Sequence, residues 1–94
     1  MAKRKPKKTP PIHPNRQACL DICSDDSMLF ADGFDECIVG VTGGLSNCVV
    51  YDKKKMIEEL VSQDMDEIDA IEYLEFNTWG AYVGEYTPVY IDLI

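Results

Sequence analysis

Apolar residues in the second half of the chain recur at intervals of three and four, the spacing of an amphipathic helix. In the stretch DKKKMIEELVSQ, Met56, Ile57, Leu60 and Val61 fall on one face, and Asp52 is placed to cap the first turn. Three lysines directly after this cap oppose the helix dipole, at a cost of roughly a few tenths of a kcal/mol. The pattern predicts a helix over residues 52–63.

The stretch DMDEIDAIEYLEFNTWGAYVG predicts a second helix, with Asp64 or Asp66 as its cap. A projection at about 100° per residue gives a core face, which consists of Ile68, Ile71, Leu74, Thr78, Trp79 and Tyr82. Glu75 falls on the same arc, so it should have a partner, reach solvent at an edge or face another subunit. Gly84 suits the left-handed position after a helix end, and Gly80 allows a close backbone approach or an earlier stop. We therefore expect the rings here to lie mostly in the core.

Shorter β-branched stretches predict three strands, at residues 35–41, 48–51 and 87–94. The loop TGGLSN between the first two is short and contains two glycines, which favours a hairpin over a crossover. Residues 17–30 form one short helix or two turns. The order strand, strand, helix, helix, strand predicts an α+β fold, with a small antiparallel sheet and two helices packed on one face.

Charge divides the chain into a basic arm and an acidic body. Residues 1–16 contain four prolines and six basic residues and no acid, which is a charge of +6. The other 94 − 16 = 78 residues hold 9 − 6 = 3 basic residues against 17 acids, which is −14. We predict a flexible, disordered arm at residues 1–16 and a single acidic α+β domain at residues 17–94. Five residues of the arm could contact nucleic-acid phosphates: Lys3, Arg4, Lys5, Lys7 and Lys8.

The sequence predicts no cofactor, no metal site and no catalytic set. Cys19 and Cys23 form a C-x3-C pair, but no second close pair follows, and the only histidine, His13, lies in the proline-rich segment. Gly80 and Gly84 lie after a helix, whereas a phosphate loop places its glycines before one. No apolar run approaches the ~20 residues of a spanning helix, so we expect a cytoplasmic protein with reduced cysteines and no membrane partner. A body of this size should be only marginally stable without help, and self-association is the help that we expect.

From about residue 34 to residue 91 the chain resembles a group of small uncharacterised proteins encoded by tailed bacteriophages. The resemblance is carried by FDECIVGV, by VVYD entering a helix, and by MDEIDAIEYLEFNTWGAYVGEYTPV. It implies a role in the cytoplasm of the infected host cell. It supplies no ligand and no catalytic residue.

These observations favour a phage accessory protein that acts without catalysis by binding a macromolecule, most simply a host protein, as an inhibitor of host defence or of a host enzyme. One alternative is a nucleic-acid-associated protein that uses its arm. Another is a homo-oligomer that binds a small ligand between subunits, around Glu75 and Glu85. The candidate interaction residues are Asp66, Glu67, Asp69, Glu72, Glu75, Tyr82, Glu85 and Tyr86.

Overall fold

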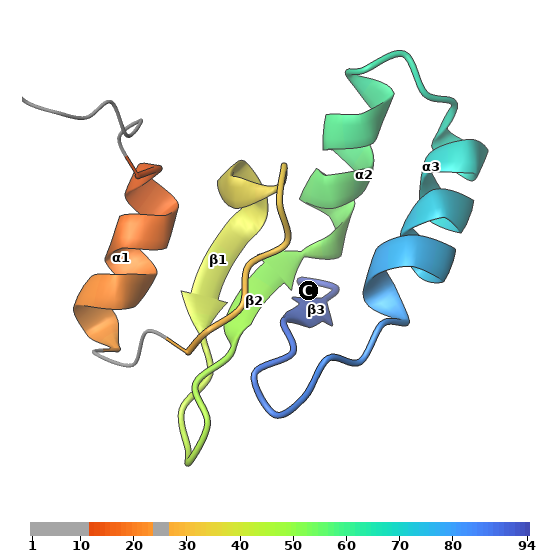
Figure 1. The fold of residues 1–94 in the computed structure, drawn as a ribbon. Helices are drawn as coiled ribbons and strands as arrows, with labels where there is room; N and C mark the ends of the chain where they lie inside the picture. The colour runs from red at the N-terminus through yellow and green to blue at the C-terminus, as the bar shows by residue number, and fades with distance from the viewer. Residues whose placement is uncertain (1–11, 24–26) are drawn as a thin grey trace, which may run out of the picture.

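The computed structural model describes residues 12–23 and 27–94, which form a small α+β domain, as predicted (Figure 1). The elements in chain order are α1 (Pro14–Ile22), the 3-10 turn η1 (Asp35–Cys37), β1 (Ile38–Val41), β2 (Val49–Asp52), α2 (Lys53–Val61), α3 (Glu67–Leu74), the π turn η2 (Glu75–Trp79) and β3 (Val89–Ile91). The five basic residues between Lys3 and Lys8 lie outside the described residues.

The sheet has the strand order β1-β2-β3. β1 and β2 pair antiparallel, which confirms the predicted hairpin. β3 pairs with β2 in parallel, with Tyr51 opposite Tyr90, so the expectation of an all-antiparallel sheet was wrong. The reason is the connection: α2 and α3 form a helical hairpin, and the segment after the π turn carries the chain back to the end of the sheet where β2 begins.

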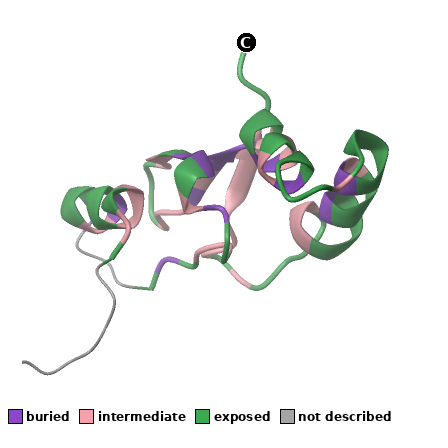
Figure 2. Cartoon of the chain, turned by 90° about the horizontal axis from the view of Figure 1, so that it is seen from above, coloured by how far each residue is buried: buried purple, intermediate pink, exposed green. Residues whose placement is uncertain are grey.

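The helices flank the sheet on two sides in both views of the molecule (Figures 1 and 2). α1 lies beside β1, and the pair α2–α3 lies on the other side. Residues 27–34, which we call the strap, cross in front of the strands in Figure 1. The buried positions shown in Figure 2 lie where these parts meet the sheet.

The core is one cluster that joins the strap, the sheet and all three helices. Its largest fully buried side chains are Tyr51, Met56, Leu74, Val49 and Cys37. Tyr51 and Val49 lie on the same face of β2, because side chains alternate along a strand. The face of the sheet that carries Tyr51 and Val49 is therefore the buried one.

Polar side chains begin each helix. The Asp52 carboxylate accepts the Lys54 N–H at 3.0 Å, which confirms the predicted cap of α2. Of the two candidate caps for α3, the structure uses Asp66, whose carboxylate accepts the Ile68 N–H at 3.2 Å. His13 caps α1 by accepting the Asn15 N–H at its Nδ1. α1 therefore begins at Pro14, within residues 1–16, for which an arm was predicted.

The core face of α3 differs from the predicted arc. Ala70 and Leu74 are fully buried, whereas Ile68 is 67% exposed and Tyr82, beyond the helix, is 79% exposed. Ala70 is small, so α2 can approach α3 closely at that position, and this turns Ile68 toward solvent. Glu75 is exposed as well, which is the second of the three outcomes expected for it.

All three predicted strands are present, but their boundaries in the structure differ from the predicted ranges. The first strand was predicted from residue 35, but Asp35–Cys37 is a 3-10 turn that leads into β1. The second strand was predicted from Cys48, but Cys48 precedes β2 and is half-buried. The last strand covers three residues, Val89–Ile91, of the predicted eight.

One hydrogen bond fastens the strap to the sheet. The Ala31 N–H donates to the Tyr51 hydroxyl at 2.7 Å, and the Tyr51 side chain is fully buried. On the same face, the Tyr51 ring packs against the Tyr90 ring, with 5.6 Å between centroids. The hydroxyl thus satisfies a backbone donor of the strap, which has no ladder partner there.

Replacing Tyr51 with Phe should lower the free energy of unfolding by about 1–3 kcal/mol, because the Ala31 N–H loses its acceptor. Urea unfolding would measure the change. The matched control, Tyr82→Phe, removes an exposed hydroxyl and should change stability by less than about 0.5 kcal/mol. Equal effects of the two substitutions would contradict this role for the Tyr51 hydroxyl.

Stability should also fall in alkaline solution. Burial, with smaller contributions from the charges of Glu59 and Asp52, raises the pKa of the Cys37 thiol from 9.0 to about 11. Burial likewise raises the pKa of Cys19 and of Tyr51. Below pH 9 the Cys37 thiol keeps its proton in both the folded and the unfolded chain. Between pH 9 and about pH 11 the thiol ionises only in the unfolded chain, so the free energy of unfolding should decrease over this range. Urea unfolding below pH 9 and near pH 11 would measure this, and Cys37→Ala should show a smaller decrease.

Candidate functional site

The acids predicted to bind a partner form an exposed surface on α3. Asp66 caps the helix, Glu67, Asp69 and Glu72 are exposed along it, and Glu75 is exposed at the start of the π turn. Residues 69, 72 and 75 are three apart, so their side chains are neighbours on one side of the helix. We call this surface the acidic face of α3.

Exposed apolar side chains accompany the acids. Ile68 and Phe76 are 67% and 85% exposed, and Tyr73 is 46% exposed. Ile68, Glu72 and Phe76 are four apart and follow one line along α3 and the start of the π turn. The surface is therefore a mixture of carboxylates and large apolar groups. The expectation that the rings of this region lie mostly in the core was wrong for Phe76 and Tyr82.

The structure places the remaining predicted residues elsewhere. Glu85 is exposed, and its carboxylate accepts a hydrogen bond from the Ser46 hydroxyl of the β1–β2 loop at 2.9 Å. The Cys48 thiol lies 3.3 Å from the Glu85 carbonyl oxygen. Tyr86 is half-buried. Glu85 thus lies beside the hairpin loop, whereas Glu75 lies on the π turn.

A π turn at Glu75–Trp79 ends the helix and was not predicted. Ala70 and Leu74 are four apart on the buried side of α3, and Trp79 follows five residues after Leu74. The i→i+5 spacing of a π turn keeps Trp79 on that side, whereas regular helix would rotate it away. Gly80 closes the turn: a Cβ there would lie 3.0 Å from the Glu75 carbonyl oxygen, so the predicted close backbone approach is present.

Trp79 joins this turn to α2 and to the end of the sheet. Its indole N–H donates to the Met56 sulfur at 3.4 Å. The Lys53 ammonium lies 4.6 Å from the centre of the Trp79 ring and 3.3 Å from an Asp92 carboxylate oxygen. These contacts explain one of the lysines that oppose the dipole of α2, because the cation–π contact and the ion pair offset its cost.

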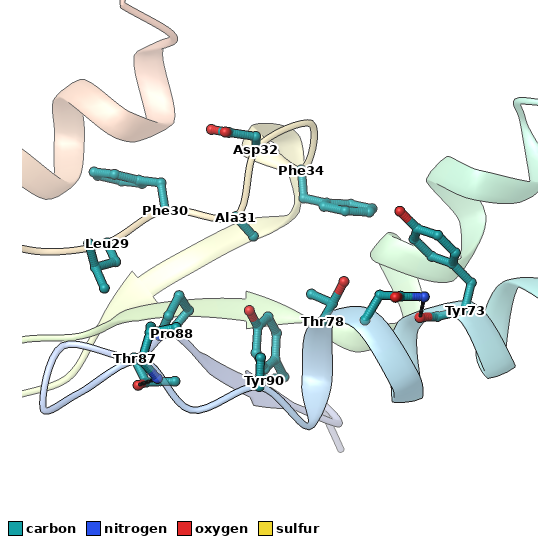
Figure 3. A pocket seen from close by; sticks show the side chains of 13 residues that line it. Leu29, Phe30, Ala31, Asp32, Phe34, Tyr73, Thr78, Thr87, Pro88 and Tyr90 are labelled. Atoms are coloured by element: carbon teal, nitrogen blue, oxygen red, sulfur yellow. Dashed lines mark hydrogen bonds between the residues drawn. The ribbon is translucent and has the colours of Figure 1, made fainter.

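A groove of about 390 Å³ lies between the strap and the segment from α3 to β3 (Figure 3). Leu29, Phe30 and Asp32 come from the strap, Tyr73 and Thr78 from α3 and the π turn, and Thr87, Pro88 and Tyr90 from the approach to β3. Burial raises the pKa of the Tyr90 hydroxyl above its ordinary value. The walls are mainly aromatic and aliphatic, with polar groups at the edges.

Arg16 links α1 to the groove. Its guanidinium lies 4.6 Å from the centre of the Phe30 ring and donates to Asp35 at 2.7 Å and to Asp32 at 3.1 Å. Partial burial opposes the charge of Arg16, but the hydrogen bonds to the two carboxylates outweigh it and raise its pKa. The first turn of α1 is therefore anchored on two residues that line the groove, Phe30 and Asp32.

Within residues 12–23 and 27–94, no group of three His, Cys, Asp or Glu side chains comes together as metal ligands. The four cysteines are free thiols. His13 serves as the cap of α1. In the described part of the chain, no helix combines the length and the apolar character needed to cross a bilayer.

Comparison with known proteins gave no match, whether to protein families, to curated proteins or to solved structures.

The π turn gives a direct test of the local geometry. Gly80→Ala should lower the free energy of unfolding by about 0.5–1.5 kcal/mol, because the added methyl group presses on the backbone carbonyl of Glu75. In the control, Gly43→Ala, the methyl group meets no atom within 4 Å, and stability should change by less than about 0.5 kcal/mol. Urea unfolding would measure both. A Gly80→Ala protein as stable as the wild type would contradict the close approach.

Proposed function

We propose that this chain is a phage accessory protein that acts without catalysis, by binding a basic surface of a host protein through the acidic face of α3. The proposal rests on one observation, which is that this face presents both carboxylates and large apolar side chains. Carboxylates alone would serve solubility, but Ile68 and Phe76 are exposed among them. Large apolar groups surrounded by charges are typical of a surface that another protein covers.

Electrostatics supports a basic partner. Residues 12–94 hold four basic residues and all 17 acids, a net charge of 4 − 17 = −13. A charge of this sign and size speeds encounter with a cationic surface and disfavours the phosphate backbone of a nucleic acid. The apolar groups would then supply affinity once water is excluded from the contact.

The resemblance to small tailed-phage proteins supplies the biological setting of the proposal. In that setting the partner is a host enzyme or a host defence protein, and binding blocks it. Homo-oligomer formation would present two or more acidic faces at once and would increase the apparent affinity through multivalency.

The test compares two variants with the same change in net charge. The site variant neutralises three acids of the face: Asp69→Asn, Glu72→Gln and Glu75→Gln. The control neutralises three exposed acids elsewhere: Glu36→Gln, Glu58→Gln and Asp64→Asn. Partners captured from host lysate by the wild type would be identified by mass spectrometry, and their affinity for all three proteins would be measured by calorimetry at two salt concentrations.

The site variant should lose about tenfold or more in affinity, and the control should stay within about twofold. Binding by the wild type should weaken as salt rises, because exposed charges are screened. Equal loss in both variants would indicate that net charge alone acts. Unchanged binding by the site variant would reject the acidic face of α3 as the contact.

A further inference from the structure

The groove between the strap and α3 has no role in the proposed function. We propose that it binds the chain's own amino-terminal residues 1–11, with their prolines against its aromatic walls and their basic side chains toward the acids of the strap and of α3. This inference stands whether or not the acidic face of α3 binds a host protein.

The walls of the groove fit a proline-rich occupant. Phe30 and Phe34 of the strap, Tyr73 of α3 and Tyr90 of β3 present rings to it (Figure 3). Aromatic grooves bind proline-rich segments, because a proline-rich backbone loses little conformational entropy on binding and its rings pack flat on aromatic surfaces. The sequence of residues 1–11, MAKRKPKKTPP, holds three prolines.

Charge complementarity favours the same occupant. Residues 1–11 carry five basic residues and no acid, a charge of +5, whereas residues 12–94 carry −13. Asp32 lines the groove, and Asp69 lies four residues before Tyr73 on the same side of α3. One carboxylate thus lines the strap wall of the groove, and a second lies one helical turn from Tyr73 on the opposite wall, within reach of a cationic segment.

The start of the described chain lies near the groove. Arg16, in the first turn of α1, contacts Phe30 and Asp32, and both line the groove. The Arg16 side chain therefore reaches from the first turn of α1 to the edge of the groove. Eleven further residues at about 3.1 Å each in a polyproline conformation can span up to about 34 Å. Binding within the same molecule is therefore sterically accessible and needs no second copy.

Residues 1–11, once bound, would cover Tyr73 and place cations beside the acidic face of α3. It would then compete with any basic partner for those carboxylates. The segment would act as an internal pseudo-ligand, and its displacement would make the face available.

Trypsin cleavage of the full-length chain tests the proposal, because a bound segment is protected from the protease. The readout is the rate of cleavage after Lys8, followed by mass spectrometry in wild type, Tyr73→Ala and Phe76→Ala. Tyr73 lines the groove and Phe76 does not, although both are exposed aromatic residues of the same helical segment. A synthetic peptide of residues 1–12 gives the unprotected rate at each salt concentration.

At low salt, wild type and Phe76→Ala should be cleaved about tenfold more slowly than the peptide, and Tyr73→Ala at about the rate of the peptide. High salt should remove the protection of the wild type. Circular dichroism would check that Tyr73→Ala is folded; if it is not, Val83→Ala, which alters another exposed groove residue, replaces it. Cleavage of the wild type at the rate of the peptide would overturn the proposal. Protection that grows with protein concentration would also overturn it, in favour of binding between copies.

Discussion

The hydrogen bond from the Ala31 N–H to the Tyr51 hydroxyl fastens the strap to the middle strand of the sheet. The sheet has only three strands, and its middle strand contributes the largest fully buried side chain. The strap crosses the face of the sheet without ladder partners of its own, so a side chain must receive its backbone donor. Because the strap forms one wall of the groove, the same bond helps to fix that wall, together with the burial of Met28 and Phe34 in the core.

Features set by neighbouring residues could be predicted from the sequence. Asp52 and Asp66 cap their helices because a carboxylate there accepts an N–H two residues on, which depends on local geometry alone. The β1–β2 hairpin followed from loop length in the same way. The direction of β3 was not predictable from its own residues, because it depends on how the helical hairpin α2–α3 returns the chain to the sheet. The core face of α3 was misplaced because a periodicity argument ranks Ile68 above Ala70, whereas close helix packing selects the smaller residue.

The acidic face of α3 and the groove differ in the same way: the first depends on neighbouring residues and the second on distant ones. The acids of α3 could be predicted to be exposed, because charged side chains avoid burial. The groove could not, because it is assembled from the strap, residues 29–34, and from residues between 73 and 90, which pattern reasoning treats separately. The only sign of the π turn in the sequence is the five-residue spacing between Leu74 and Trp79. A projection that assumes a uniform helix cannot detect this spacing as a π turn.

That spacing has a consequence for which chain lengths the fold can tolerate. Deleting one residue between Leu74 and Trp79 would leave an ordinary four-residue step, so the tryptophan could still reach Met56 through a regular helix. Asn77 and Thr78, which line the groove, would then shift in register or be lost. The one-residue insertion therefore shapes the wall of the groove, whereas the contact between Trp79 and Met56 could be made from either kind of turn.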